Sequence, residues 1–303
     1  MYKRQGNKYE LNTVTLINEV DYDFSKLSLG LSTTIDKDIA NSKNIKHTDL
    51  FTQWQGLIVD NEISIGARII DHDKFSSHAT YNLNWAKDLT ATTRINASYG
   101  SATNLPDHYK NNLNIVAGKT SIKPERSKNL ELGLSNSFEW GEVDIKLYKS
   151  KVTDSFSYKS ASPAYYINDG IVNISGVEVS FETDFIGWDI DTNIDYNKAI
   201  AASTNLQKGR RPNRSISLNL SKASGKWSRN INWVAYSSAW DKDNHSNGKN
   251  GGYGLLNIRT SYDFTENLSI YLNRNNTLDK SYETAKGYNT LGKTTTIGLT
   301  YNF

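Results

Sequence analysis

Residues 130–138 have the sequence LELGLSNSF, in which large apolar side chains alternate with small or polar ones. The same period of two residues returns in residues 188–197, 215–221 and 295–303. Alternation at 180° per residue predicts β-strands with one apolar face, and no stretch shows a comparable helical period. We therefore expect an all-β chain in which helix does not compete with strand anywhere.

The connections between the predicted strands are of two kinds. The strands are about ten to fourteen residues long, and a tilted strand crosses a bilayer with about nine to eleven. Short turns alternate along the chain with longer polar connections. The short turns fall near residues 21–25, 60–61, 86–89, 139–142, 186–187, 224–226 and 265–267, and the longer connections near 36–46, 71–76, 102–127, 155–170, 199–212, 241–252 and 277–290. Short turns at one end and long loops at the other are typical of an outer-membrane β-barrel, whereas a soluble sandwich has no need of them.

The two faces of the predicted strands also fit a barrel in a membrane. The polar face is rich in Asp, Glu, Asn, Ser and Gly on successive strands, as a water-filled or plugged lumen requires. Trp140, Trp188 and Trp227 each lie beside a short turn, with Phe303 expected at a similar depth. Rings at one level of every hairpin indicate an interfacial aromatic girdle.

Composition excludes several other classes of protein. The 303 residues include no Cys, which excludes disulfide scaffolds, thiolate zinc sites and thiol catalysis. No stretch approaches the roughly 18 apolar residues of a transmembrane helix. The net charge of +3 is small and evenly spread, so no nucleic-acid partner is expected.

The number of predicted strands suggests that the sequence is part of a longer barrel. The turns and loops together imply about fifteen strands, whereas single-chain bacterial barrels have even numbers. If Phe303 ends on the periplasmic side, an odd number places Met1 on the extracellular side, where barrel assembly does not leave a chain start. The polar N-terminus also carries no signal peptide. We expect this chain to be the C-terminal part of a longer barrel.

A series of motifs resembles TonB-dependent outer-membrane receptors. Residues 121–133 are similar to the family's LKPExSxxxExG segment, and residues 173–178 to its IxGVE strand. Residues 208–212 resemble an Arg-Arg-Pro segment that opens a later strand, and residues 276–283 resemble NLFDKxYE. Gly287-Tyr288 and the terminal Tyr301-Asn302-Phe303 follow in the family's order, so that the resemblance covers about residues 75–303.

The resemblance implies a barrel of 22 strands closed around an N-terminal plug. The chain then supplies a partial barrel domain over residues 1–303, with the plug and about the first seven strands missing. It implies a transport receptor rather than an enzyme, a place in the Gram-negative outer membrane, and no cofactor. The implied partners are membrane lipid and lipopolysaccharide, TonB acting through the missing plug, and the cargo; a monomer is expected.

The cargo expected from the resemblance is cobalamin or a similar corrinoid. Within the family, Asp279 to Gly292 and the compact loops look most similar to cobalamin transporters. Two alternatives stay open. One is a TonB-dependent receptor of the same type that takes up a ferric siderophore or haem, and the other is a plugless porin, a diffusion channel without energy coupling.

Two ligand-binding residues follow from the resemblance, Arg210 and Asn244. Arg210 matches an Arg that contacts cargo in cobalamin-binding members, and its planar fork of donors suits amide carbonyls or phosphate. Asn244 stands where those members have an aromatic residue, a departure that removes a stacking surface and counts against cobalamin. Residues 241–245, Asp-Lys-Asp-Asn-His, also carry alternate oxygen ligands for a divalent cation but lack the Gly and terminal Glu of a calcium loop. No catalytic or metal-binding residue is therefore expected.

Gly176 is expected to face the lumen, because it shares the parity of the polar residues in its strand. It would serve there to leave room for a plug or to bend the strand.

Overall fold

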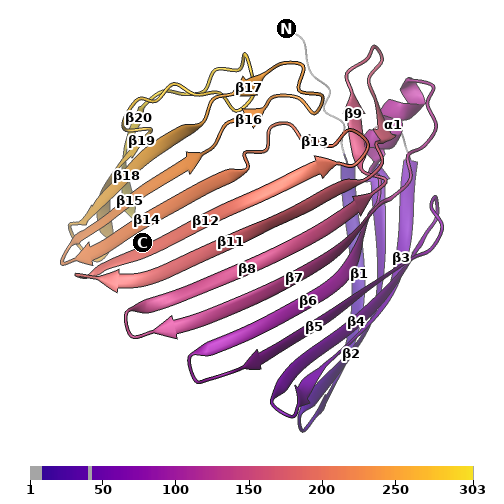
Figure 1. The fold of residues 1–303 in the computed structure, drawn as a ribbon, viewed down its shortest axis with the longest axis horizontal. Helices are drawn as coiled ribbons and strands as arrows, with labels where there is room; N and C mark the ends of the chain where they lie inside the picture. The colour runs from indigo at the N-terminus through magenta and orange to yellow at the C-terminus, as the bar shows by residue number, and fades with distance from the viewer. Residues whose placement is uncertain (1–8, 40–42, 303) are drawn as a thin grey trace. The chain divides into compact units, whose positions relative to one another are not determined.

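The main feature of the fold is an antiparallel meander of long strands (Figure 1). A computed structural model of the chain describes residues 9–39 and 43–302. Within these residues the main sheet contains 16 strands, and 15 of them follow one hydrogen-bonded path that keeps the order of the sequence. This confirms the predicted all-β class and the expected number of strands. Among the described residues, no helix has the length and apolar character needed to cross a membrane.

The chain divides into two compact units, whose boundary cuts across β6, β7, β8 and β11. Unit 1 comprises residues 1–88, 96–131 and 150–172, and unit 2 the remainder. The elements that lie wholly within unit 1 are β1 (Tyr9–Tyr22), β2 (Ser25–Asp38), β3 (Lys43–Ile58), β4 (Asn61–His72), β5 (His78–Asp88), α1 (His108–Val116), β9 (Phe156–Lys159) and β10 (Tyr165–Asn168). The elements shared between the units are β6 (Thr93–Asn104), β7 (Glu125–Phe138), β8 (Gly141–Thr153) and β11 (Val172–Phe185). Unit 2 alone contains β12 (Trp188–Ala201), β13 (Leu206–Gln207), β14 (Arg214–Ser224), β15 (Trp227–Tyr236), β16 (Ala239–Trp240), β17 (Lys249–Asn250), β18 (Tyr253–Asp263), β19 (Leu268–Asn275) and β20 (Thr294–Tyr301).

The predicted asymmetry of the connections is present. Two residues join β1 to β2, β3 to β4, β7 to β8, β11 to β12 and β14 to β15, whereas β12–β14, β15–β18 and β19–β20 are joined by longer loops. The 36–46 connection is shorter than expected, because β2 continues to Asp38 and β3 begins at Lys43. Residues 40–42 of that connection and the terminal Phe303 lie outside the described residues.

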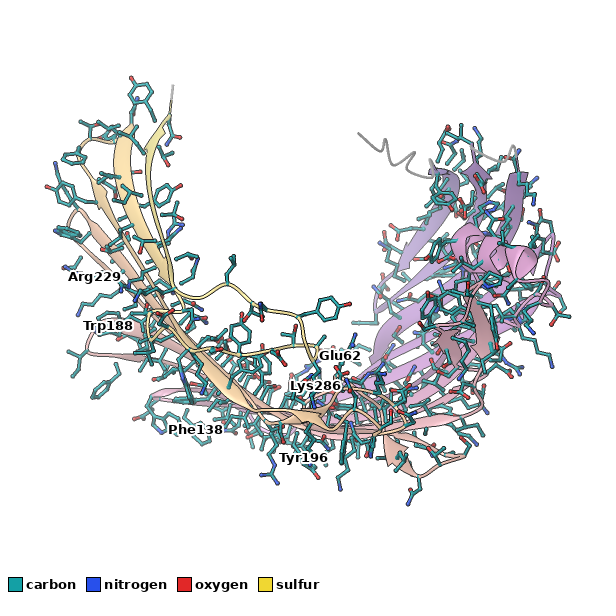
Figure 2. All side chains as sticks on the ribbon, turned by 90° about the horizontal axis from the view of Figure 1, so that it is seen from above. Glu62, Phe138, Trp188, Tyr196, Arg229 and Lys286 are labelled. Atoms are coloured by element: carbon teal, nitrogen blue, oxygen red, sulfur yellow. The ribbon has the colours of Figure 1, made fainter. Side chains whose placement is uncertain are left out.

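The strands carry an apolar and a polar face, as their alternation predicts. Along β7, Leu130, Leu132 and Leu134 are exposed on one face, whereas Glu131 and Gly133 lie on the other. In unit 2, Figure 2 shows Phe138, Trp188 and Tyr196 on one side of the sheet and Lys286 on the other. We call these the apolar face and the polar face.

Aromatic rings gather beside the short turns of unit 2. Trp140 in the β7–β8 turn stacks on Phe138 with ring centroids 4.6 Å apart and also contacts Phe181. Trp227, the first residue of β15, packs against Tyr262 at 4.9 Å. Their places at the turn end of the strands agree with the position expected for an aromatic girdle.

The prediction that the chain contains no helix is wrong, since α1 interrupts the 105–124 loop. The side chain of Asp107 accepts the Lys110 amide at 2.8 Å and caps the first turn. The helix buries Asn rather than an apolar stripe: Asn114 donates to the Thr120 and Tyr166 carbonyl oxygens and accepts the Tyr166 amide. A helix held by polar side chains leaves no apolar period of 3.6 residues, which is why the sequence pattern missed it.

Gly176 does not leave open space on the polar face. A Cβ at this position would lie 2.4 Å from the Tyr148 Oη and 2.7 Å from the Tyr196 carbonyl oxygen. The expected room for a plug at this point is filled by the Tyr148 ring, which corrects that interpretation.

Candidate ligand-binding surface

Three long loops of unit 2 meet at one end of its strands. They are residues 202–213, 237–252 and 276–293, which carry the short strands β13, β16 and β17 (Figure 1). We call them loop A, loop B and loop C in chain order. Each follows a strand that runs away from a short turn, so the antiparallel order of β12, β14, β15, β18, β19 and β20 brings all three to the same end.

One carboxylate joins the three loops. The side chain of Asp241 in loop B is only 1% exposed. Its Oδ1 accepts from the Arg210 Nε of loop A at 3.1 Å and from the Lys286 amide of loop C at 2.9 Å. Its Oδ2 accepts from the Asn247 Nδ2 at 2.6 Å, within loop B itself.

These donors hold Asp241 ionised. The hydrogen bond from Asn247, followed by the Lys286 amide, lowers the pKa of the Asp241 carboxyl well below its usual range, and Arg210 adds to the effect. A buried carboxylate without such donors would shift in the opposite direction because of desolvation. Asp241 is therefore an anion that arranges its surroundings at all physiological pH values.

A second carboxylate, Asp243, ties loop B to loop A. Its oxygens accept from the Lys208 ammonium group and, at 2.7 Å, from the Gly209 amide. Burial opposes ionisation of Asp243, but the bonds from Lys208 and Gly209 outweigh it and lower the pKa of the carboxyl. Both acidic residues of the Asp-Lys-Asp sequence thus face nitrogen donors, and among the described residues no group of three His or acidic side chains could hold a metal ion.

Aromatic stacking completes loop B. The His245 ring lies parallel to Trp240, with centroids 4.0 Å apart and an interplanar angle of 8°. His245 Nε2 donates to the Gln207 carbonyl oxygen of loop A at 2.8 Å, which fixes the proton on that nitrogen. The Lys249 ammonium group lies 4.7 Å from the Trp240 ring centroid, within the range of a cation–π contact. The sequence pattern pointed to His245 only as the end of a weak cation-ligand sequence, and it did not point to Trp240, which directly precedes the Asp-Lys-Asp sequence.

The two residues expected to bind ligand both lie in this cluster, but they are placed differently. Arg210 is held by Asp241 through Nε while 52% of its side chain stays exposed. Asn244 is exposed, and its side-chain oxygen accepts from the amide and hydroxyl of Ser246, which closes a turn within loop B. Asn244 therefore shapes loop B, whereas Arg210 presents free surface.

The loop cluster is positively charged. Loops A, B and C contain eight Lys and Arg against four Asp and Glu, a net charge of +4 compared with +3 for the whole chain. Three of the four carboxylates, Asp241, Asp243 and Asp279, are already paired with cations of the cluster. The remaining positive charge favours an anionic ligand.

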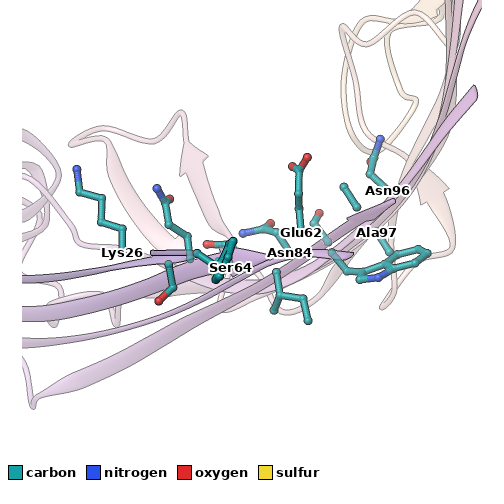
Figure 3. Close-up of a pocket in the computed structure, with 14 residues that line it drawn as sticks. Lys26, Glu62, Ser64, Asn84, Asn96 and Ala97 are labelled. Carbon is teal, nitrogen blue, oxygen red and sulfur yellow. The ribbon is translucent and has the colours of Figure 1, made fainter. Parts of the chain in front are cut away.

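Unit 1 has a depression of about 530 Å³ near the short-turn ends of its strands. Figure 3 shows Lys26, Glu62 and Asn96 standing on the same side of these strands. Lys26 pairs with Glu19 at 2.7 Å, so the charge of this lysine is compensated within unit 1.

Comparison with solved structures supports the fold over nearly the whole chain. The ferric enterobactin receptor PfeA of Pseudomonas aeruginosa is similar with a TM-score of 0.81 and 17% identity, over 97% of this chain and 54% of that one. The copper transporter OprC gives a TM-score of 0.81 and 16% identity, over 97% of this chain and 57% of that one. The siderophore receptor PirA of Acinetobacter baumannii gives a TM-score of 0.79 and 15% identity, over 97% of this chain and 55% of that one. The chain thus spans little more than half the length of these receptors.

A family model described as "TonB dependent receptor-like, beta-barrel" matches residues 4–276. The match extends to strands before residue 75, which the motif series did not cover. The family consists of outer-membrane transport receptors rather than enzymes. With this match over most of its length, and with the meander described above, the chain belongs to the TonB-dependent receptor β-barrel family.

Proposed function

We propose that the protein containing this chain is an outer-membrane receptor that takes up an anionic metal chelate of the siderophore type, driven through TonB. Residues 1–303 supply part of its barrel domain, and loops A, B and C supply part of the extracellular surface that first meets the cargo. The observation that carries this proposal is the net charge of +4 on three loops around the exposed Arg210. The printed names of the similar structures, which include a ferric enterobactin receptor and a siderophore receptor, are consistent with such a cargo.

A corrinoid such as cobalamin is the second candidate. It is favoured by the resemblance of Asp279–Gly292 to cobalamin transporters and by the donors of Arg210, which suit amide carbonyls and a phosphodiester. The loop position that those transporters fill with an aromatic residue is occupied here by Asn244, although the Trp240–His245 stack offers rings nearby.

Equilibrium binding to the full-length receptor separates the two cargoes. We expect ferric enterobactin, used as an anionic probe, to bind in a salt-dependent manner, because dissolved ions screen the attraction between exposed charges, over a length of about 10 Å at 0.1 M salt. Cyanocobalamin, which carries no net charge, should bind without that dependence if the corrinoid assignment holds. If neither probe binds and the protein instead conducts ions in a planar bilayer, the porin alternative replaces both.

Substitutions of two arginines test whether the ligand-binding site includes Arg210. Arg210→Ala should weaken binding of the cognate probe about tenfold, since leaving one charged hydrogen bond unmade costs about 1–3 kcal/mol. Arg126→Ala is the control, because Arg126 is similarly exposed, pairs with Asp154 and shares the parity of the apolar face. Equal affinities for the wild type and Arg210→Ala would remove Arg210 from the site.

A further inference from the structure

Asp241 forms hydrogen bonds with loops A and C as well as within its own loop B. A residue that only stabilised the turn of loop B would not need these partners. Besides Arg210 and Lys286, its Oδ1 lies 3.5 Å from the Asn250 Nδ2, and Asn250 also donates to the Thr284 carbonyl oxygen of loop C. Lys286 returns a bond of its own, from Nζ to the Asn247 carbonyl oxygen at 2.8 Å. Loop C is therefore attached to loop B around a single buried charge.

Loop A is bound to the same charge through Arg210, in addition to its bonds with Asp243. Arg210 has a left-handed backbone, with φ of 55°, a conformation that costs a non-Gly residue free energy unless its surroundings hold it. Two contacts with loop B hold it there: the Arg210 amide donates to the Trp240 carbonyl oxygen, and Nε donates to Asp241. Both contacts are made to adjacent residues, Trp240 and Asp241.

The geometry of Arg210 follows from this attachment. A guanidinium group is planar and carries five N–H donors in a fixed fork. With Nε directed at Asp241, the orientation of the guanidinium plane is restricted, while 52% of the side chain stays exposed. A ligand that meets Arg210 then finds donors already oriented, and does not have to order a free side chain, which costs about 0.5–1.5 kcal/mol.

We propose that Asp241 is the positioning residue of this surface: it joins loops A, B and C and orients Arg210 toward the cargo. The statement about Arg210 rests on the proposed function, whereas the joining of the loops stands without it. Asp279 serves as a matched comparison in the same cluster. It accepts the Lys293 amide at 2.9 Å and pairs with the Lys293 ammonium group, but both partners belong to loop C.

Hydrogen exchange on the full-length receptor tests the joining of the loops without any ligand. In Asp241→Ala, we expect amide exchange to accelerate at least tenfold in residues 205–213 and 280–290, because the Lys286 amide loses its acceptor and Arg210 of loop A loses the partner of its Nε. Asp279→Ala should accelerate exchange only near residues 291–295. Residues 105–124 in unit 1 should exchange as in the wild type in both variants.

Two results would overturn the proposal. Unchanged exchange in residues 205–213 and 280–290 of Asp241→Ala would show that other contacts hold the loops. Acceleration of the same size in residues 105–124 would show general destabilisation rather than a local role.

A double-mutant cycle tests the orientation of Arg210. With the probe that the wild type binds, Asp241→Ala should weaken affinity about tenfold, and it should have little further effect in an Arg210→Ala background. Full additivity of the two losses would contradict positioning through Arg210. If neither ferric enterobactin nor cyanocobalamin binds the wild type, the proposed cargo fails, while the exchange experiment still decides whether Asp241 joins the loops.

Discussion

Asp241 connects two features that are separate in the sequence. The Asp-Lys-Asp-Asn-His sequence looked like a weak set of cation ligands, and Arg210 looked like a ligand contact 31 residues away. In the structure the acidic residue and the arginine are hydrogen-bonded partners. The carboxylates of loop B therefore bind cations of the protein itself, and about half of the Arg210 side chain stays exposed beside them.

The first prediction concerns the pH dependence of this attachment. The pKa of Asp241 is lowered in the folded protein, so its contribution to stability is fully present above the unfolded value of about 3.9 and is lost as pH falls through the lower folded value. We expect exchange of the Lys286 amide, corrected for the intrinsic rate, to be constant from about pH 7 to about pH 5 and to accelerate only below about pH 4. Asp241→Asn cannot titrate there, so an acid step of equal size in that variant would assign the step to another group.

Pairs of glycine and an aromatic residue recur across neighbouring strands on the polar face. The Phe51 ring covers Gly30, the Tyr271 ring covers Gly298, and the Tyr148 ring covers Gly176. Gly30 and Phe51 are direct cross-strand partners, as are Tyr271 and Gly298. A ring that lies over a glycine restores the packing that the missing side chain would have supplied.

The second prediction distinguishes two of these glycines. A Cβ at Gly176 meets the backbone carbonyl of Tyr196 as well as Tyr148, whereas the three atoms nearest to a Cβ at Gly298 all belong to the movable end of Tyr271. Gly176→Ala should therefore destabilise the barrel by about 1–3 kcal/mol, the usual cost of overpacking, and Gly298→Ala by less. The temperature at which the folded band of the receptor converts to the unfolded band on a gel measures the difference. Gly251→Ala is the control, because nothing lies within 4 Å of the added Cβ; equal shifts for Gly176→Ala and Gly251→Ala would contradict the prediction.

Across all the long strands, the alternation of side chains produces one apolar face and one polar face, which suit different environments. Exposed large apolar residues run along strand after strand, for example Leu29 and Leu31 on β2, Ile65 and Ile69 on β4, and Leu132 on β7. In water this much exposed apolar surface would drive aggregation. On a barrel of this family it is the surface that faces lipid.

The third prediction tests that assignment with two neighbours on β7. Leu132→Arg places a charge on the apolar face, and a charge near the middle of a bilayer costs a barrel about 2–4 kcal/mol. Glu131→Arg places the same side chain on the polar face, where water or polar groups receive it. We expect Leu132→Arg to lower the amount of folded receptor in the outer-membrane fraction, and Glu131→Arg to leave it near the wild-type amount. The opposite order would mean that the faces of β7 are assigned the wrong way round.

The class of the fold, the number of strands and the end of the strands at which each loop lies can all be recognised from the amino-acid sequence. This was possible because a strand repeats every two residues, so its faces can be recognised within a stretch as short as residues 130–138. Because consecutive strands are joined as antiparallel hairpins, successive connections lie at opposite ends of the sheet, and no contact between distant residues is needed to predict this. The prediction of about fifteen strands succeeded on these local signals alone.

The tertiary structure alone decided how the loops are held. Helix α1 follows no apolar period, because its buried side chains are polar and bind the backbone of β10, 52 residues further along the chain. Asp241 joins partners 31 residues before it and 45 residues after it, and no local pattern connects such positions. The contact between Tyr148 and Gly176 also joins residues that are far apart in the sequence and lie on neighbouring strands. Polar contacts between distant residues form only when the antiparallel sheet has brought the loops to one end, so their partners follow from the folded structure and not from the order of residues.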